Sequence, residues 1–232
     1  MSSLKGKFSK RFIYSNKIRH SNIIRLLEVF ESNKHYLIVM EFAGGGDLLH
    51  FIKRRGKMQE SDAKFIFKQI VYGLAHIHCR SVIHRDIKLD NILLDWESGV
   101  KIWDFGVSKI VKKGQIINEQ WGTPAYIAPE IITDEGYEGF FVDVWSLGVL
   151  LYAMVSGTVP FKAPTMDELH KLIKKGDFTF PWELTNEAKS IIKGWITIDP
   201  LKRLTFPEIL AHEWLKETNE DSEEDEEEEE DD

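Results

Sequence analysis

Four polar residues between positions 82 and 106 have the types and the spacing needed to act on a phosphate group. The stretch reads VIHRDIKLDNILLDWESGVKIWDFG and carries Asp86, Lys88, Asn91 and Asp104. Phosphoryl transfer requires groups that position a nucleotide with its magnesium ions and that stabilise charge, rather than covalent chemistry by the protein. A buried turn rich in Asp and Asn between two strands is the alternative, but the fixed spacing argues against it.

The spacing, His-Arg-Asp-x-x-x-x-Asn followed by Asp-Phe-Gly, resembles that of the eukaryotic protein kinase family and of its serine/threonine branch. The resemblance implies that ATP and Mg²⁺ are the cofactors. Asp86 would accept or orient the proton of the attacking hydroxyl, and Lys88 would place a cation near the transferred phosphate. Asn91 and Asp104 would supply oxygen ligands, which suit Mg²⁺.

Four neighbouring residues would support this site without touching the phosphate. The resemblance implies that His84 and Phe105 connect the catalytic loop to the Asp-Phe-Gly segment, which Gly106 completes. Arg85 would meet an anionic group of the activation segment, the stretch 104–130 that ends in IAPE.

The sequence Gly122-Thr123-Pro124 resembles the substrate-binding loop of serine/threonine kinases. In that family Thr123 would contact both Asp86 and Lys88. A lysine two residues after the catalytic aspartate, together with this loop, argues against a tyrosine kinase. The resemblance therefore implies protein substrates that carry serine or threonine.

Glu119 lies three residues before Gly122, where many members of the family carry an activating phosphothreonine. Its carboxylate could pair with Arg85 without any phosphorylation. We therefore expect a segment that does not need phosphorylation at the usual site. An exposed loop acid that contributes little is the alternative.

Three further residues resemble the scaffold of the kinase large lobe. Asp143 would bind the backbone of the His-Arg-Asp turn and hold it rigid. Glu130 would pair with Arg203 in a buried ion pair. Truncation of either partner would leave an unpaired buried charge, at a cost of about 3–5 kcal/mol.

The nucleotide pocket is assigned by the same resemblance. Met40 falls at the gatekeeper position, and the hinge from Glu41 to Ala43 would bind adenine through its backbone. Leu93 would form the floor under the adenine. Asp47 matches the acid that binds the ribose, and it could also cap the helix that follows.

The chain departs from the family ahead of His20. No Gly-x-Gly-x-x-Gly loop and no Val-Ala-Ile-Lys strand occurs there, and Arg11 stands where the family has a helix glutamate. The lysines of this stretch are expected to form a solvated basic terminus. We therefore expect weak ATP binding by this chain and an N-terminally truncated small lobe.

The expected fold is α+β and kinase-like, with a mostly helical large lobe and a partial small-lobe β-sheet. Hydrophobic periodicity and β-type runs give the elements. We expect strands at 23–30, 35–42, 92–94 and 100–103, and helices at 48–55, 60–79 and 144–155. The expected domains are a partial small lobe with a helix remnant at 1–42, a large lobe at 43–216 and a disordered tail at 217–232.

The C-terminal stretch DPLKRLTFPEILAHEWL resembles the closing motif of calmodulin-dependent and SNF1-related kinases. Its apolar residues are expected in the core. They are Leu201, Leu204, Ile209, Leu210 and Trp214.

The net charge of −8 is unevenly distributed, because residues 217–232 hold 13 of the 38 acids and no base. The rest of the chain has 25 acids against 30 bases. Such a tail cannot bury apolar surface. It is expected to be a solvated linker that another kinase could phosphorylate at Thr218 or Ser222, or else a segment that lies across the basic body.

The composition indicates the cellular compartment in which the protein is expected. The single cysteine, Cys79, allows no internal disulfide, fits a reducing compartment and is expected in the core. The longest apolar run, 147–155, is too short to span a membrane. We expect a cytoplasmic protein, with the nucleus as an alternative, that binds neither nucleic acid nor membrane.

Two functions follow. The first is a serine/threonine kinase that transfers the γ-phosphate of ATP to protein hydroxyls. The second is a non-catalytic, kinase-like binding or scaffold module. The intact set from Asp86 to Asp104 favours the first, and the absent glycine loop and strand lysine favour the second.

Overall fold

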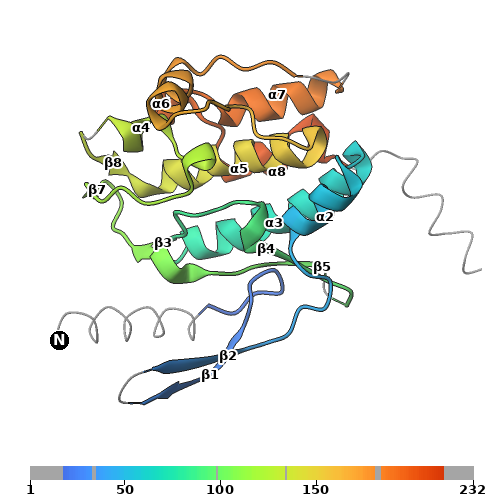
Figure 1. Cartoon of the computed structure of the whole chain (residues 1–232), viewed down its shortest axis with the longest axis vertical. Helices are drawn as coiled ribbons and strands as arrows, with labels where there is room; N and C mark the ends of the chain where they lie inside the picture. The colour runs from blue at the N-terminus through green and yellow to red at the C-terminus, as the bar shows by residue number, and fades with distance from the viewer. Residues whose placement is uncertain (1–17, 33–34, 98, 134, 181–183, 217–232) are drawn as a thin grey trace, which may run out of the picture.

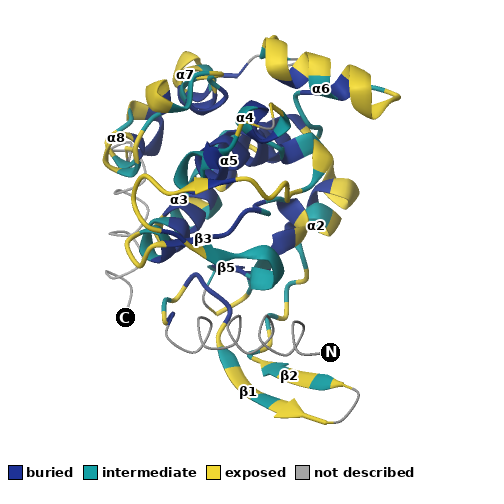
Figure 2. Ribbon diagram, turned by 90° about the vertical axis from the view of Figure 1, so that its left-hand side faces the viewer, coloured by how far each residue is buried: buried dark blue, intermediate teal, exposed yellow. Residues whose placement is uncertain are grey.

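Helix α5 (Gly139–Ser156) forms the centre of the molecule, and nearly all of its residues are buried (Figure 2). The computed structural model describes residues 18–32, 35–97, 99–133, 135–180 and 184–216. The helix is apolar on every side, as core helices are. It is long and apolar enough to cross a membrane, but 89% of it is buried inside the protein, so the core accounts for its composition.

Two helices pack against α5, namely α3 (Glu60–His78) and α7 (Asn186–Trp195) (Figure 1). Helices α5 and α7 approach closely at Gly148, where an added Cβ would lie 2.7 Å from the Cβ of Trp195. The ring of Phe67 on α3 lies 5.1 Å from the Trp195 ring. Burial of such large rings is the main favourable term in forming this core.

Shorter helices surround this core. Helix α2 (Leu48–Arg55) starts at Asp47, whose side chain accepts a hydrogen bond from the His50 amide, and ends at Gly56, where φ is 89°. These caps satisfy backbone groups that the helix itself leaves unpaired. The others are α4 (Pro129–Ile132), α6 (Met166–Lys175) and α8 (Phe206–Leu210).

In the described part of the chain the strands form four antiparallel pairs rather than one large sheet. The longest pair, β1 with β2, forms a hairpin, and the pair β4 with β5 lies against α3. The pairs are β1 (Leu26–Glu31) with β2 (Tyr36–Met40), β3 (Val82–Ile83) with β6 (Lys109–Ile110), β4 (Ile92–Asp95) with β5 (Gly99–Ile102), and β7 (Ile116–Ile117) with β8 (Tyr137–Glu138).

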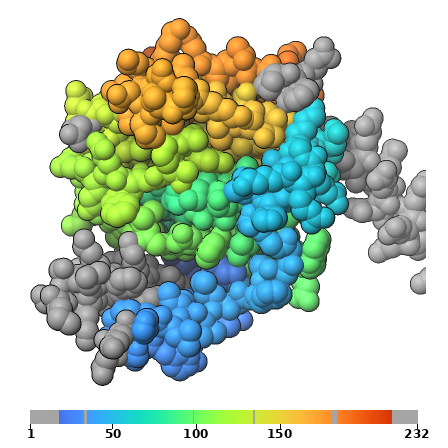
Figure 3. Space-filling view, in the orientation of Figure 1, coloured from blue at the N-terminus to red at the C-terminus, as the bar shows by residue number. Residues whose placement is uncertain are grey.

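The β1–β2 hairpin lies below the helical part in Figure 3, where it is blue. The chain just before it joins β5, because the amide of Ile24 donates to the carbonyl of Ile102 at 2.9 Å. Lys101 of β5 forms an ion pair with Glu41 at 3.3 Å. These contacts fix the hairpin at the edge of the larger part, where the predicted hinge begins.

The expected α+β, kinase-like fold is present. The predicted elements appear with bounds close to those expected, although β1 and β2 are shorter than the runs 23–30 and 35–42. The division of the chain at residues 42 and 43 stays a prediction. Arg11, the helix remnant and the acidic tail lie outside the described residues.

Two burial predictions are wrong. Cys79 is exposed rather than in the core, because it caps the C-terminus of α3 where the chain turns at the surface. Leu201 is 79% exposed, since it follows Pro200 in a surface turn. The other residues of that closing motif are buried or partly buried against the core, namely Leu204, Ile209, Leu210 and Trp214.

Candidate active site

Asp86, Lys88 and Thr123 form a closed triangle of contacts. The hydroxyl of Thr123 donates to Asp86 Oδ1 at 2.7 Å, and Lys88 Nζ donates to the same hydroxyl at 2.9 Å. Lys88 Nζ also lies 2.9 Å from Asp86 Oδ2. The contacts predicted for Thr123 are therefore present, and they join the catalytic loop to the substrate loop 37 residues away. One carboxylate, one cation and one hydroxyl meet in a partly exposed position.

Asn91 and Asp104 offer oxygen atoms next to this triangle. The Asn91 amide nitrogen donates to the carbonyl oxygen and to Oδ2 of Asp86, at 2.8 and 3.0 Å. That arrangement leaves the amide oxygen of Asn91 for a cation. Asp104 is exposed and has a left-handed backbone at φ 56°, and its Oδ1 accepts from the Gly106 amide at 3.0 Å.

This donor set fits Mg²⁺, which proteins bind through one or two side-chain oxygens together with substrate phosphates and water. Asn91 and Asp104 are the residues that would hold it. Within the described ranges no group of three or more His, Cys, Asp or Glu residues could form an all-protein metal site. A cation at this place would therefore depend on the nucleotide for its remaining ligands.

Asp143 at the start of α5 anchors the catalytic loop from below. Its two carboxylate oxygens accept from the backbone amides of His84 and Arg85, each at 2.7 Å. The second of these residues has φ 69°, a conformation that a non-glycine residue adopts only when its surroundings hold it. The role predicted for Asp143 in holding this turn is consistent with these bonds.

His78 is a member of this anchor that the sequence did not reveal. Its Nε2 lies 2.8 Å from Asp143 Oδ2, and both side chains are buried. Burial alone would raise the pKa of Asp143. The hydrogen bonds from the His78 side chain and the His84 backbone amide outweigh burial and hold that pKa below its ordinary value. Its partner lies 65 residues away in the sequence, so no local spacing signals the contact.

His84 connects the catalytic loop to the segment around Asp104, as predicted. Its Nε2 contacts the carbonyl oxygen of Trp103 at 3.0 Å, and its ring lies 5.0 Å from the Phe105 ring. Burial lowers the pKa of His84, so the ring is neutral near pH 7. A neutral ring with the proton on Nε2 satisfies the carbonyl and leaves Nδ1 to accept from the Asp86 amide, 3.3 Å away.

Glu119 holds the activation segment to the catalytic loop. Arg85 donates to Glu119 Oε2 at 2.8 Å, and Lys109 donates to Oε1 at 3.0 Å. Tyr137 adds a hydrogen bond from its hydroxyl to the Glu119 carbonyl at 2.7 Å. Hydrogen bonds from Arg85 and Lys109 hold the pKa of Glu119 below its ordinary value. The predicted pairing is present, although half of the Glu119 side chain is exposed, and its contribution to activity stays a prediction.

Glu130 and Arg203 form a bidentate ion pair beneath the activation segment. The two guanidinium nitrogens donate to the two carboxylate oxygens at 2.6 and 2.7 Å. The Arg203 guanidinium also stacks over the ring of Trp145, at 5.1 Å from its centroid. The pair is present as predicted, and it ties the end of the activation segment to the chain that follows α7.

The predicted nucleotide residues line the junction between the hairpin and the large lobe. Asp47 caps α2 through the His50 amide at 2.8 Å, and it forms an isolated β-bridge with Leu93. Glu41 accepts from the Arg25 amide at 2.7 Å, so its side chain is bound to the hairpin. The structure therefore places the hinge beside β4 by backbone contacts.

Two predicted residues of the junction remain. Met40 is exposed, and Ala43 is half-buried. Gly45 between them and α2 approaches β4 so closely that an added Cβ would lie 2.7 Å from the Leu94 carbonyl oxygen. A glycine is required at that contact. No bound nucleotide tests the predicted roles of these residues, which stay predictions.

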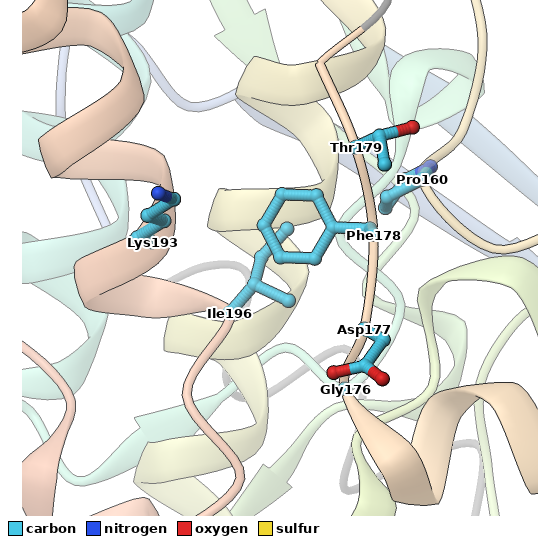
Figure 4. A pocket seen from close by; sticks show the side chains of 7 residues that line it. All are labelled: Pro160, Gly176, Asp177, Phe178, Thr179, Lys193 and Ile196. Carbon is cyan, nitrogen blue, oxygen red and sulfur yellow. The ribbon is translucent and has the colours of Figure 1, made fainter.

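A hollow of about 630 Å³ lies elsewhere, between the segment that follows α6 and the end of α7 (Figure 4). Its wall combines the apolar side chains of Phe178 and Ile196 with the charged side chains of Asp177 and Lys193. None of the residues that line it belongs to the predicted site. The hollow therefore does not compete with the catalytic loop as the place of chemistry.

The chain belongs to the protein kinase family, because the model of the protein kinase domain matches residues 7–215. The match includes every described residue of the candidate site. The fold, the catalytic loop and the family thus agree on one class of protein.

The curated relatives are serine/threonine kinases of the SNF1, MARK and SIK type. The chain is 38% identical over 206 residues to the serine/threonine-protein kinase SIK3 homolog of Danio rerio. This alignment covers 89% of this chain and 17% of the relative. It is 40% identical over 203 residues to the probable serine/threonine-protein kinase MARK-A of Dictyostelium discoideum (88% and 19%).

A plant relative shows the same type. The chain is 41% identical over 197 residues to the serine/threonine protein kinase OSK3 of Oryza sativa subsp. indica, covering 85% of this chain and 39% of that one. The chain thus spans 17% to 39% of the length of these curated relatives.

Proposed function

We propose that this chain transfers the γ-phosphate of ATP to serine and threonine hydroxyls of protein substrates. The observation that supports the proposal is the triangle of Asp86, Lys88 and Thr123, in which a carboxylate, a cation and a hydroxyl are in direct contact. The names of the relatives support the class of substrate.

Each residue of the triangle has a separate task. Asp86 would accept the proton of the substrate hydroxyl. At the same time the substrate oxygen forms a bond to the γ-phosphorus, and the bond from that phosphorus to the leaving ADP oxygen breaks. Lys88 would stabilise charge on the phosphoryl oxygens, and Thr123 holds Asp86 in a fixed orientation. MgATP supplies the phosphoryl group and a cation that neutralises its charge.

The surrounding contacts keep these groups in place before any substrate binds. Asp143 fixes the backbone of the loop, and Asn91 holds the Asp86 carboxylate from the other side. Such preorganisation lowers the barrier because little reorganisation remains for the reaction itself.

The test is transfer of radiolabelled phosphate from ATP to a mixture of serine and threonine peptides. We expect Asp86→Asn to lower the rate by about 10²–10⁴-fold, the usual contribution of a catalytic base. Asp62→Asn is the matched control, because Asp62 is exposed on α3 outside the site. Equal rates in the wild-type chain and in Asp86→Asn would contradict the proposal.

A non-catalytic binding module is the second candidate. In this sequence, the residues ahead of β1 include no glycine-rich loop and no strand lysine of the kind that would bind the phosphates of ATP. MgATP titration distinguishes the two. Binding that is lost in Asp104→Asn supports the kinase with weakened nucleotide affinity, whereas no binding at millimolar ATP supports the module.

We also propose the cytoplasm as the setting, with the nucleus as the alternative, since the single cysteine suits a reducing compartment. Imaging of the full chain with a fluorescent tag tests this. Accumulation in an oxidising compartment would contradict it.

A further inference from the structure

Trp103 stands on the nucleotide side of the β4–β5 hairpin. It directly follows β5, and its amide donates to the carbonyl of Asn91 at 3.1 Å, so these two residues lie opposite each other. Side chains alternate between the faces of a strand pair. Trp103 therefore shares a face with Asn91 and Leu93, whereas Ile92 and Ile102 point to the core and are fully buried.

That face is where the predicted nucleotide and metal residues gather. Asn91 and Leu93 lie on it, Asp104 follows Trp103 directly, and Asp47 is bridged to Leu93. The position of Trp103 is thus surrounded by predicted nucleotide-binding residues, although sequence reasoning gave it no role beyond the end of a strand.

The indole of Trp103 is held in place by a hydrogen bond. Its Nε1 donates to the backbone carbonyl oxygen of Asp90 at 3.0 Å. The bond is exposed and the ring is only partly buried, so the indole covers an open surface rather than filling the core. The indole ring of Trp103 therefore covers the surface next to Asn91. Its N–H group donates to the Asp90 carbonyl oxygen, which a hydroxyl group of a ligand could otherwise donate to.

We propose that the indole of Trp103 is a built-in occupant of the nucleotide site, which a nucleotide must displace from the Asp90 carbonyl before it can bind. The proposal rests on the proposed function, since it assumes that this face takes MgATP. It identifies Trp103 as a residue that sets nucleotide affinity. A ring that simply covers apolar surface, or one that stacks on the adenine, would predict different results.

Substitution of Trp103 removes the ring and spares the contacts of its backbone. The carbonyl that meets His84 and the amide that meets Asn91 are main-chain groups, so they persist in Trp103→Ala. The variant is therefore expected to fold, and thermal unfolding of each variant checks this. Trp103→Phe keeps an aromatic ring and loses only the N–H donor.

The experiment is calorimetric titration of the full chain with MgADP and with MgATP. We expect the Kd of Trp103→Ala to be about tenfold lower than that of the wild-type chain, or about 1.4 kcal/mol, which is the scale of one hydrogen bond. Trp103→Phe should lie between the two. Phe65→Ala is the control: this ring is 67% exposed on α3, outside the candidate site, and its loss should leave Kd unchanged.

A second readout follows the ring itself. Displacement should change the tryptophan emission of the wild-type chain on nucleotide binding, and that change should be absent in Trp103→Phe but present in Phe65→Ala. This signal does not depend on catalytic activity.

The outcomes separate this proposal from the proposed function. Equal nucleotide affinity in the wild-type chain and in Trp103→Ala contradicts the proposal that the indole occupies the nucleotide site, but it does not contradict the kinase function. Weaker binding in Trp103→Ala also overturns this proposal, because the ring would then be a stacking platform for the adenine. No binding by either chain overturns both.

Discussion

Glu119 accepts a hydrogen bond from Arg85 at 2.8 Å through one carboxylate oxygen and a second from Lys109 at 3.0 Å through the other. The arginine side chain is almost fully buried, and half of the glutamate side chain is exposed. A permanent carboxylate thus occupies the place where many kinases require a phosphate. Glu119, an unmodified side chain, therefore joins the activation segment to the catalytic loop without phosphorylation.

Glu119→Ala tests whether this contact supports catalysis. We expect the rate of phosphate transfer to fall about tenfold, because the buried Arg85 loses its partner and the activation segment its anchor. Glu97→Ala, which removes an exposed acid in the β4–β5 turn, should have no effect. Phosphatase treatment of the wild-type chain should also leave the rate unchanged. An unaltered rate in Glu119→Ala would remove the support for a phosphorylation-independent segment.

Loss of the ion pair between Glu130 and Arg203 should be costly. We expect Glu130→Ala to lower the free energy of unfolding by about 3–5 kcal/mol, because Arg203 is fully buried and would be left unpaired. Urea denaturation measures the change. Lys202→Ala is the control: its ion pair with Asp199 is exposed at 3.5 Å, and such pairs contribute about 0–1 kcal/mol. Similar losses in the two variants would contradict the assignment.

His78 should matter for both stability and rate. We expect His78→Phe to lower the free energy of unfolding by about 1–3 kcal/mol, since a buried carboxylate loses a partner, and to lower kcat because the catalytic loop rests on Asp143. His76→Phe is a matched change two residues earlier on α3. The Nε2 of His76 is buried without a hydrogen-bond partner in the described part of the chain, so this nitrogen loses no hydrogen bond. If kcat changes equally in both variants, the link from His78 to the loop is wrong.

Stability should fall as the solution becomes acidic. Burial lowers the pKa of His84 below its ordinary value of 6.5, so the unfolded chain binds the proton first as the pH drops. The stabilising contribution is therefore fully present above pH 6.5 and is lost as the pH falls toward the folded-state pKa. Burial also lowers the pKa of three other histidines, which act in the same direction, namely His20, His76 and His212.

Chemical denaturation at several pH values between 7.5 and 5.5 measures this slope. The slope should be shallower in His84→Phe, which keeps a ring beside Phe105 but cannot bind a proton. Asp143 and Glu119 have lowered pKa values and do not titrate in this window. A free energy of unfolding that rises on acidification would show that other groups dominate.

Local sequence signals predicted the elements well. The helix expected at 48–55 is α2 itself, because Asp47 and Gly56 cap it and both signals lie next to it in the chain. The contacts of Thr123 and Arg203 were also predicted, since a resemblance to a known family carries information about distant partners. The error at Cys79 had a different origin, for the end of α3 lies at the surface and no periodicity reveals that.

Two contacts could not be predicted from the chain alone. His78 meets Asp143 only because α3 and α5 pack side by side, which brings together residues 65 positions apart. Trp103 bonds to the Asp90 carbonyl because the register of β4 and β5 sets it opposite Asn91. In both cases the residue type permits many partners, and tertiary packing selects one.

Phosphate transfer to three peptides that differ only in a serine, threonine or tyrosine acceptor tests the central claim most directly. The account predicts transfer to serine and threonine at millimolar MgATP, little transfer to tyrosine, and loss of all transfer in Asp86→Asn. Absence of transfer by the wild-type chain, or equal transfer by Asp86→Asn, would contradict a catalytic role for the triangle of Asp86, Lys88 and Thr123.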